Sequence, residues 1–341
     1  MKKTIERVLF SLFLSGTLLF SGCSTDDEED ELVGNWKKIS DFEGVARCSA
    51  VAFTVNGTAY IATGGYGGYK YRLDDLWAYN EANGTWTQKA SMPATARTYA
   101  VGFGTDRAGY VGLGYDGDNY LRDFWKYDPA NNEWSKASDF GGSARRAAVA
   151  FSVGGVGYVG CGYDGNHLKD FWKYDETADS WVQVTSIGGS KRVGASAFVI
   201  DDTAYVVGGY NNSTDVNDFW AYDAATDTWT EKRKIADVSD DDDFDDEYTS
   251  ITRSFGVAFT MFGHGFLTCG ERSGSAVSTT WEYDPQNDLW TERTEFEAGG
   301  RSEAVAFSLN DRGYVLTGKS ATYQYDDMWE FFPRDEHDEY D

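Results

Sequence analysis

The sequence predicts an all-β protein built from six similar units, each with four short strands. The 12 Trp form two interleaved series, and one of these recurs every 47 or 48 residues, apart from a single step of 61. Within a unit, short aromatic and β-branched runs alternate with Gly-, Asn- and Asp-rich turns. Four strands in about 40–50 residues indicate one blade of a β-propeller. The two series are Trp77, Trp125, Trp172, Trp220, Trp281 and Trp329, and Trp36, Trp86, Trp134, Trp181, Trp229 and Trp290.

Three other residue types keep a fixed register with the Trp series. Each unit has an Arg before its first strand, a Phe six residues later and a Gly seventeen residues after the Arg, or eighteen in the first unit. The arginines are Arg47, Arg97, Arg145, Arg192, Arg253 and Arg301. The glycines are Gly65, Gly114, Gly162, Gly209, Gly270 and Gly318. Six copies of one register predict six blades.

The third unit shows how the strands are read from the residues. Apolar and aromatic runs separated by turn residues predict four strands, at Ala148–Val153, Val156–Cys161, Asp170–Asp175 and Ser180–Val184. The register of Arg, Phe, Gly-Gly, aromatic-Trp-x-Tyr-Asp and Trp resembles the kelch repeat over residues 34–332. The resemblance implies a six-bladed kelch-type β-propeller with four antiparallel strands per blade. The double Gly is intact only at Gly64-Gly65 and Gly208-Gly209.

The phase of the repeat predicts how the ring closes. The chain enters with a fourth strand around Trp36 and leaves with a third strand around Trp329. Two open edges would be templates for aggregation, so the N-terminal strand should complete the last blade. The loops after strands two and four then share one face, which we expect to bind ligand. The tether and the C-terminus should leave from the opposite face.

The N-terminus predicts export and a lipid anchor. A basic start is followed by an apolar run of thirteen residues, too short to span a bilayer, so residues 1–22 are expected to be a signal peptide. Cys23 stands in a sequence that resembles a bacterial lipobox, which implies lipidation. Residues 23–33 form an acidic tether similar to the export signal of surface lipoproteins, which implies an outer-membrane protein facing the exterior; a plain spacer facing the periplasm is the alternative. Residues 333–341 are an acidic tail.

Charge and composition limit the partners. A net charge of −26 argues against binding nucleic acid. The 3 His and 4 Cys provide little material for a metal centre, and we expect no cofactor. Some kelch propellers resemble galactose oxidase, but the His are spread over different loops, so its copper site is not expected. Cys48, Cys161 and Cys269 fall in different blades and are predicted to be free, buried thiols. The propeller is expected to be monomeric.

The six arginines are the first candidates for the binding site, and two interpretations stay open. Each Arg could pair with an Asp and hold the blades together, which repetition in all six blades favours. Alternatively, they form a basic funnel, since some kelch relatives use arginines at this position to contact acidic peptides. Aromatic side chains after the glycines would add rings suited to sugars or peptides. These are Tyr66, Tyr115, Tyr163 and Tyr210.

An acidic insertion distinguishes the fifth blade. Residues 235–251 are expected to be a solvated loop; a flap over the arginines and a Ca²⁺ site at Asp241, Asp243 and Asp245 are alternatives. The main functional prediction is a non-catalytic binding module for a glycan or protein ligand at the channel mouth. A second kelch group, which epimerises sialic acids, suggests an enzyme with Glu303 or Glu271 as its base. A structural subunit of an outer-membrane complex is the third possibility.

Overall fold

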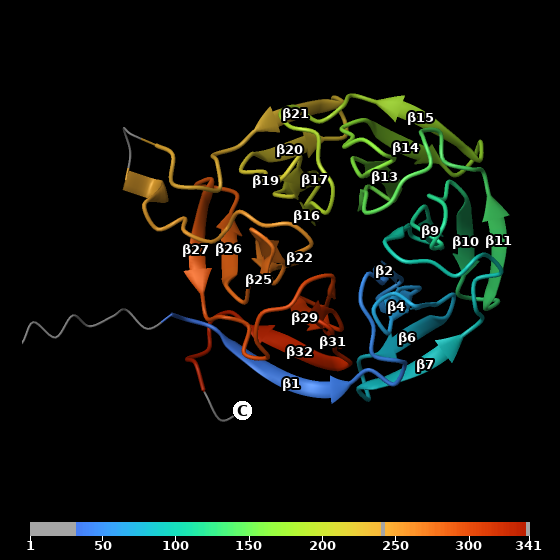
Figure 1. Cartoon of the computed structure of the whole chain (residues 1–341), viewed down its shortest axis with the longest axis horizontal. Helices are drawn as coiled ribbons and strands as arrows, with labels where there is room; N and C mark the ends of the chain where they lie inside the picture. The colour runs from blue at the N-terminus through green and yellow to red at the C-terminus, as the bar shows by residue number, and fades with distance from the viewer. Residues whose placement is uncertain (1–31, 240–242, 339–341) are drawn as a thin grey trace, which may run out of the picture. The chain divides into compact units, whose positions relative to one another are not determined.

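Six antiparallel four-stranded sheets stand around a common axis in the part of the chain that the computed structural model describes, residues 32–239 and 243–338 (Figure 1). The chain is therefore all-β, and the predicted six blades are confirmed. The strands predicted for the third unit are found to within one residue. Blade one is β2 (Val51–Val55), β3 (Thr58–Ala62), β6 (Leu76–Asn80) and β7 (Thr85–Lys89); blade two is β8 (Val101–Gly104), β9 (Gly109–Gly112), β10 (Phe124–Asp128) and β11 (Glu133–Ala137); blade three is β12 (Val149–Val153), β13 (Val156–Gly160), β14 (Phe171–Asp175) and β15 (Ser180–Val184).

The second half of the ring repeats this order. Blade four is β16 (Ser196–Ile200), β17 (Thr203–Val207), β20 (Phe219–Asp223) and β21 (Thr228–Glu231); blade five is β22 (Val257–Met261), β23 (His264–Thr268), β26 (Thr280–Asp284) and β27 (Leu289–Arg293); blade six is β28 (Val305–Leu309), β29 (Arg312–Leu316), β32 (Asp327–Phe332) and the N-terminal β1 (Asn35–Asp41). Four blades carry a small hairpin between strands two and three. These hairpins are β4 (Gly65–Tyr66) with β5 (Tyr71–Arg72), β18 (Tyr210–Asn211) with β19 (Thr214–Asp215), β24 (Glu271–Arg272) with β25 (Ser275–Ala276), and β30 (Lys319–Ser320) with β31 (Tyr323–Gln324).

Strand β1 closes the ring, as the phase of the repeat predicts. It lies beside β32 (Figure 1) and pairs antiparallel with it. This pairing places Trp36 opposite Phe331. The Trp36 side chain is fully buried, stacks on Phe331 with ring centroids 4.6 Å apart, and meets Phe296 edge-on at 4.8 Å. Because β1 covers the outer edge of β32, the sixth blade has the same four-stranded form as the others.

The first strand of each blade lies at the centre, where small residues allow close packing. A channel of about 190 Å³ is lined by first-strand residues, mostly Ala and Val. The Phe of each repeat packs against the next blade, and in four places it lies over a Gly there. A Cβ on Gly109 would come within 2.0 Å of the Phe53 ring, and one on Gly157 would come equally close to Phe103. The Phe series therefore fixes the spacing between blades.

The described limbs of the acidic insertion are anchored by buried side chains and are not wholly solvated. In its described limbs, Ile235, Tyr248 and Ile251 are buried and pack in one core cluster with Trp281 and Trp290. The Trp290 backbone N–H donates to the Tyr248 hydroxyl at 2.7 Å. The 3-10 turn η1 (Asp243–Asp245) lies at the outer edge of the ring beside blades four and five, not over its centre (Figure 1). The described part of the insertion is thus no flap over the arginines.

Candidate binding face

The loops that follow strands two and four share one face, as the connectivity predicts. In every blade, the residue after the Arg forms an antiparallel backbone bridge with a residue in the loop that follows strand two. The bridges are Cys48 with Gly65, Thr98 with Tyr115, Arg146 with Tyr163, Val193 with Tyr210, Ser254 with Glu271, and Ser302 with Lys319. We call this surface the loop face.

These bridges correct the predicted glycine register of the first blade. Gly64, not Gly65, is equivalent to the glycines of the other blades, and it also stands seventeen residues after its Arg. Its φ is +100°, and the five equivalents lie between +93° and +106°. A Cβ on Gly64 would lie 2.9 Å from the Cys48 carbonyl oxygen, so glycine is required there. The residue before it has φ near +60°, which Thr63 and Leu113 tolerate.

The six arginines form ion pairs and hydrogen bonds inside the blades. Each is at most 2% exposed, and each donates through Nη1 to the carbonyl that precedes the required glycine. Five pair with the Asp at the start of the third strand; where the pair is bidentate, the distances are 2.6–2.9 Å. The pairs are Arg47–Asp75, Arg97–Asp123, Arg145–Asp170, Arg192–Asp218 and Arg301–Asp327.

This arrangement supports the structural interpretation of the arginines. A bidentate pair holds the loop before strand one to the start of strand three, and an Arg fits this geometry because its guanidinium is planar. The buried guanidinium groups have no face open to a ligand. We therefore assign the arginine series to the stability of the blades, and the ligand candidates must be sought among the residues around it.

Two residues after each Arg, the backbone forms a closed ring at the inner end of the loop face. Each N–H donates to the carbonyl of the corresponding residue in the preceding blade, at 2.7–3.1 Å. All six have φ between +47° and +63°. The backbone conformation is the same in all six blades, but the side chains differ. These positions around the axis are therefore where one blade differs from the next. The six residues are Ser49, Tyr99, Ala147, Gly194, Phe255 and Glu303.

The aromatic members of this ring lie over the channel. Tyr99 and Phe255 belong to blades two and five, which are opposite each other, yet their ring centroids are 6.0 Å apart. A Cβ on Gly194 would lie 2.8 Å from the Phe255 ring, so Gly194 makes room for this side chain. The two rings therefore contact each other across the axis, although their blades lie on opposite sides of the ring.

Glu303 is the centre of a buried hydrogen-bond network. Its carboxylate accepts from the hydroxyls of Tyr69 at 2.6 Å, Tyr99 at 2.9 Å and Ser49, and pairs with Lys319 at 3.0 Å. Burial, with the nearby Glu303 charge, raises the pKa of Tyr69 and Tyr99 above the ordinary tyrosine value. A carboxylate already engaged by three hydroxyls and a cation is suited to tying blades one, two and six together. Sequence analysis missed Tyr69, because it lies in the loop between β4 and β5, whose sequence differs from those of the corresponding hairpins in the other blades.

The four candidate tyrosines are half-buried on the loop face. Tyr66 stacks on Tyr71 at 4.9 Å, in blade one. The other three belong to a row of ring contacts that runs from blade two to blade four with centroid distances of 5.2–6.1 Å. We call this row the aromatic arc; it consists of Tyr115, Tyr120, Tyr163, His167 and Tyr210.

The aromatic arc ends at a pocket between blades four and five. The pocket has a volume of about 820 Å³ and lies between the β18/β19 and β24/β25 hairpins. The Ser273 backbone N–H donates to Asp215 at 2.9 Å and links the two hairpins. The wall of the pocket combines aromatic rings, hydroxyls and charged groups, a mixture suited to a polar ligand with an apolar face. The principal lining side chains are Tyr210, Asp215, Thr252, Phe255, Glu271 and Arg272.

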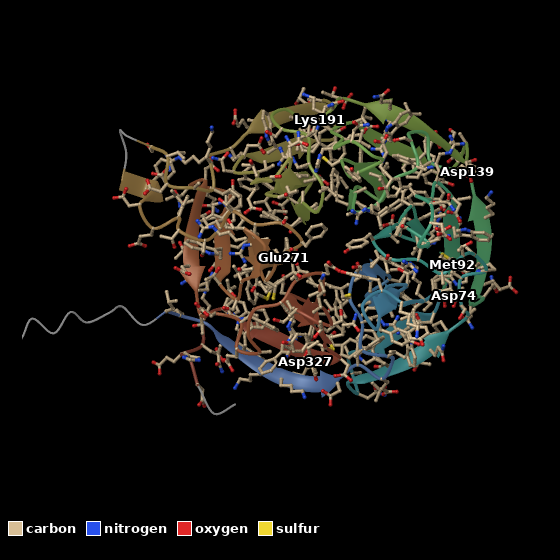
Figure 2. The ribbon with its side chains drawn as sticks, in the orientation of Figure 1. Asp74, Met92, Asp139, Lys191, Glu271 and Asp327 are labelled. Atoms are coloured by element: carbon tan, nitrogen blue, oxygen red, sulfur yellow. The ribbon has the colours of Figure 1, made fainter. Side chains whose placement is uncertain are left out.

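Of the two proposed catalytic carboxylates, only Glu271 faces this pocket. It lies on the inner part of blade five (Figure 2) and accepts from the Ser302 hydroxyl at 2.7 Å. Glu303 belongs to the buried network and is not among the lining residues. Sequence analysis offered the two carboxylates as alternatives, and in the structure only Glu271 lines the pocket. Sequence reasoning missed Arg272 and Asp215; their only signal is that the hairpin sequences differ from blade to blade.

Of the three residues predicted to bind Ca²⁺, only Asp245 has a described side chain. Asp241 and the side chain of Asp243 lie outside the described residues. Asp245 is described, and its carboxylate lies in a group with Asp237 and Asp246.

A rigid ring of blades with variable loops on one face defines the class of protein, an interaction scaffold. The profile of the KLHDC2/KLHL20/DRC7 Kelch-repeats domain matches residues 34–191, and that of the Kelch motif matches residues 191–234. The chain is a kelch β-propeller. No curated protein matches it.

Proposed function

We propose that this kelch propeller is a lipid-anchored protein of the cell surface that binds a glycan or a protein ligand in the pocket between blades four and five. The observation that carries the proposal is the pocket itself, a cavity of about 820 Å³ on the loop face that continues the aromatic arc. Rigid strands position its loops, an arrangement that many proteins use for binding sites.

The chemistry of the pocket supports a polar ligand. The rings of Tyr210 and Phe255 offer flat apolar surfaces for a sugar face or a peptide side chain. Arg272 is exposed and offers a planar donor group, whereas the six arginines that precede the first strands are buried. The hydroxyls of Thr252 and Ser254 add small donors and acceptors. These groups suit recognition, and the buried network of Glu303 favours a scaffold over acid–base chemistry.

The surface location rests on the N-terminal sequence, residues 1–33, most of which lies outside the described part of the chain. An apolar stretch, Cys23 and a run of acids support export and lipidation. Within the described residues, no helix has the length and apolar character needed to cross a bilayer.

Glycan and peptide arrays probed with the full-length chain in detergent test the ligand proposal. We expect Tyr210→Ala and Arg272→Ala to weaken the selected binding at least tenfold. Tyr323→Ala and Arg107→Ala are matched controls, since both side chains are exposed and outside the pocket. Equal losses in all four variants, or no loss in the first two, would place the ligand elsewhere.

The location is tested separately. Cys23→Ser should abolish incorporation of radiolabelled palmitate in a bacterial expression host, and intact cells should lose surface labelling of the protein. Surface labelling that persists in Cys23→Ser, or palmitate incorporation into Cys23→Ser, contradicts the anchor at this residue. Failure here would leave the binding pocket unaffected.

A further inference from the structure

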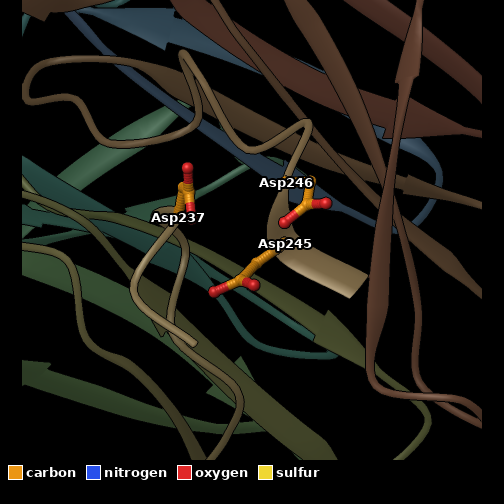
Figure 3. A group of neighbouring side chains, drawn as sticks. All are labelled: Asp237, Asp245 and Asp246. Atoms are coloured by element: carbon orange, nitrogen blue, oxygen red, sulfur yellow. The ribbon is translucent and has the colours of Figure 1, made fainter. Parts of the chain in front are cut away.

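The insertion in blade five brings three carboxylates together at the outer edge of the ring. Asp237 stands on its first limb, while Asp245 and Asp246 stand on its second limb (Figure 3). One carboxylate oxygen from each residue lies within 4.8 Å of the other two. Asp237 and Asp246 are exposed, whereas Asp245 is buried.

Asp245 provides an observation that is independent of this clustering. Its side chain is 0% exposed, and its Oδ2 accepts from the backbone N–H groups of Val238 and Ser239 at 2.9 and 3.0 Å. Its Oδ1 is buried and has no hydrogen-bond partner. A buried acceptor without a partner is unfavourable, and more so when it carries a charge. A buried carboxylate oxygen of this kind indicates a ligand that supplies the missing partner.

The kind of ligand follows from the donor atoms and the charge. Three carboxylates repel one another, and the chain as a whole has a net charge of −26. A cation would offset the repulsion and give Asp245 Oδ1 the partner that it lacks. Carboxylate oxygens are hard ligands, which favour Ca²⁺ or Mg²⁺ over the softer transition metals.

The setting of the three carboxylates favours Ca²⁺, because they come from two limbs and combine one buried with two exposed groups. Ca²⁺ binds oxygens at about 2.4 Å and accepts irregular geometry. Mg²⁺ requires a shorter, near-octahedral arrangement at about 2.1 Å. We propose that Asp237, Asp245 and Asp246 form a Ca²⁺ site that joins the two limbs of the insertion. The site does not depend on the ligand proposed above.

The position of the site gives it a structural effect. The limbs are anchored by the burial of Ile235 and Tyr248, one on each side of the three carboxylates. An ion shared by both limbs would hold the two limbs together near these anchors. Ca²⁺ should therefore slow amide hydrogen exchange in residues 235–251 and leave the other blades unchanged.

Calorimetric titration of the full-length chain with Ca²⁺ tests the proposal, with the protein first treated with a chelator. We expect one site with a dissociation constant on the order of 10⁻⁴–10⁻³ M, as in extracellular Ca²⁺ modules, and weaker binding of Mg²⁺. Asp237→Asn and Asp246→Asn should each weaken Ca²⁺ binding at least tenfold. Both residues are exposed, so these variants keep the fold even if Asp245→Asn does not.

Asp202→Asn is the matched control, because it removes the same charge from an exposed residue far along the chain from the insertion. It should leave Ca²⁺ binding unchanged. Binding that falls equally in Asp202→Asn and Asp237→Asn would mean diffuse attraction to an acidic surface and would overturn the site. So would the absence of a saturable titration, or hydrogen exchange in residues 235–251 that Ca²⁺ does not slow.

Discussion

In blade five, Arg253 Nη2 donates to the Thr279 hydroxyl at 2.7 Å, at the position where the other five blades have an aspartate. Arg253 Nη1 also donates to the Thr279 carbonyl at 2.9 Å, and Ser250 and Ile251 supply further carbonyls. The guanidinium is thus hydrogen-bonded to neutral acceptors and buried. Burial lowers the pKa of Arg253 to about 10.

We predict that Thr279→Asp stabilises the protein by about 1–3 kcal/mol, because it supplies the missing counter-charge in a geometry that five blades already use. The reverse change, Asp75→Thr, should cost about 3–5 kcal/mol, since it leaves Arg47 buried without its carboxylate. Urea denaturation of both variants measures this. A destabilised Thr279→Asp together with a neutral Asp75→Thr would show that the ion pairs do not stabilise the blades.

The same pairs predict loss of stability in acid. Burial opposes ionisation of Asp123, Asp170 and Asp327, but hydrogen bonds and charge from their arginines lower the pKa of each below its usual value. Their stabilisation is complete above the unfolded pKa of about 3.9 and is lost as the pH falls through the lower folded values.

Urea midpoints measured from about pH 6 down to about pH 2.5 should therefore be steady at first and fall below about pH 4. Asp123→Asn should be less stable at neutral pH but lose less on acidification, because one of the titrating groups is gone. If Asp123→Asn loses as much stability as the parent below that pH, then the Arg97–Asp123 pair is not a source of the acid sensitivity.

Closure of the ring by β1 predicts a large effect of Trp36. Trp36→Ala removes a fully buried indole from between Phe296 and Phe331 and should cost about 3–5 kcal/mol. Loosening β1 also exposes the edge of β32, so the variant should form oligomers visible by size-exclusion chromatography. Lys38→Ala on the same strand, whose side chain makes an exposed ion pair with Asp41, should change stability by less than about 1 kcal/mol.

The described thiols should be unreactive in the native protein. Cys48, Cys161 and Cys269 are free and buried, as predicted from the sequence. Burial raises the pKa of Cys48 and Cys269 to about 11 and that of Cys161 to about 12. Because the thiolate reacts, alkylation by iodoacetamide at about pH 8 should be slow at all three sites and become fast in denaturant. Peptide mass spectrometry reports each site, and rapid labelling of native Cys161 would contradict its burial.

The repeat made the fold predictable, because each blade must bury the same faces against its neighbours. The Trp and Phe series located the strands, and the phase of the repeat placed β1 beside β32. The register failed only at Gly64 and Gly65, where two adjacent glycines are equivalent in sequence. Their difference is a backbone angle: Gly64 has φ +100°, and a side chain there would strike the Cys48 carbonyl.

The sequence by itself determined the number of blades, the closing strand and the shared face of the loops, because these depend on periodic packing within and between neighbouring repeats. The repeat also offered the pairing of arginines with aspartates as one interpretation, and the structure shows it in five blades. Only the tertiary structure decided that Tyr99 meets Phe255 near the axis and that Arg272 and Tyr210 share a pocket. These last contacts join loops that are far apart in the chain and differ between blades. No local pattern encodes them, since they arise only when the ring brings the loops together.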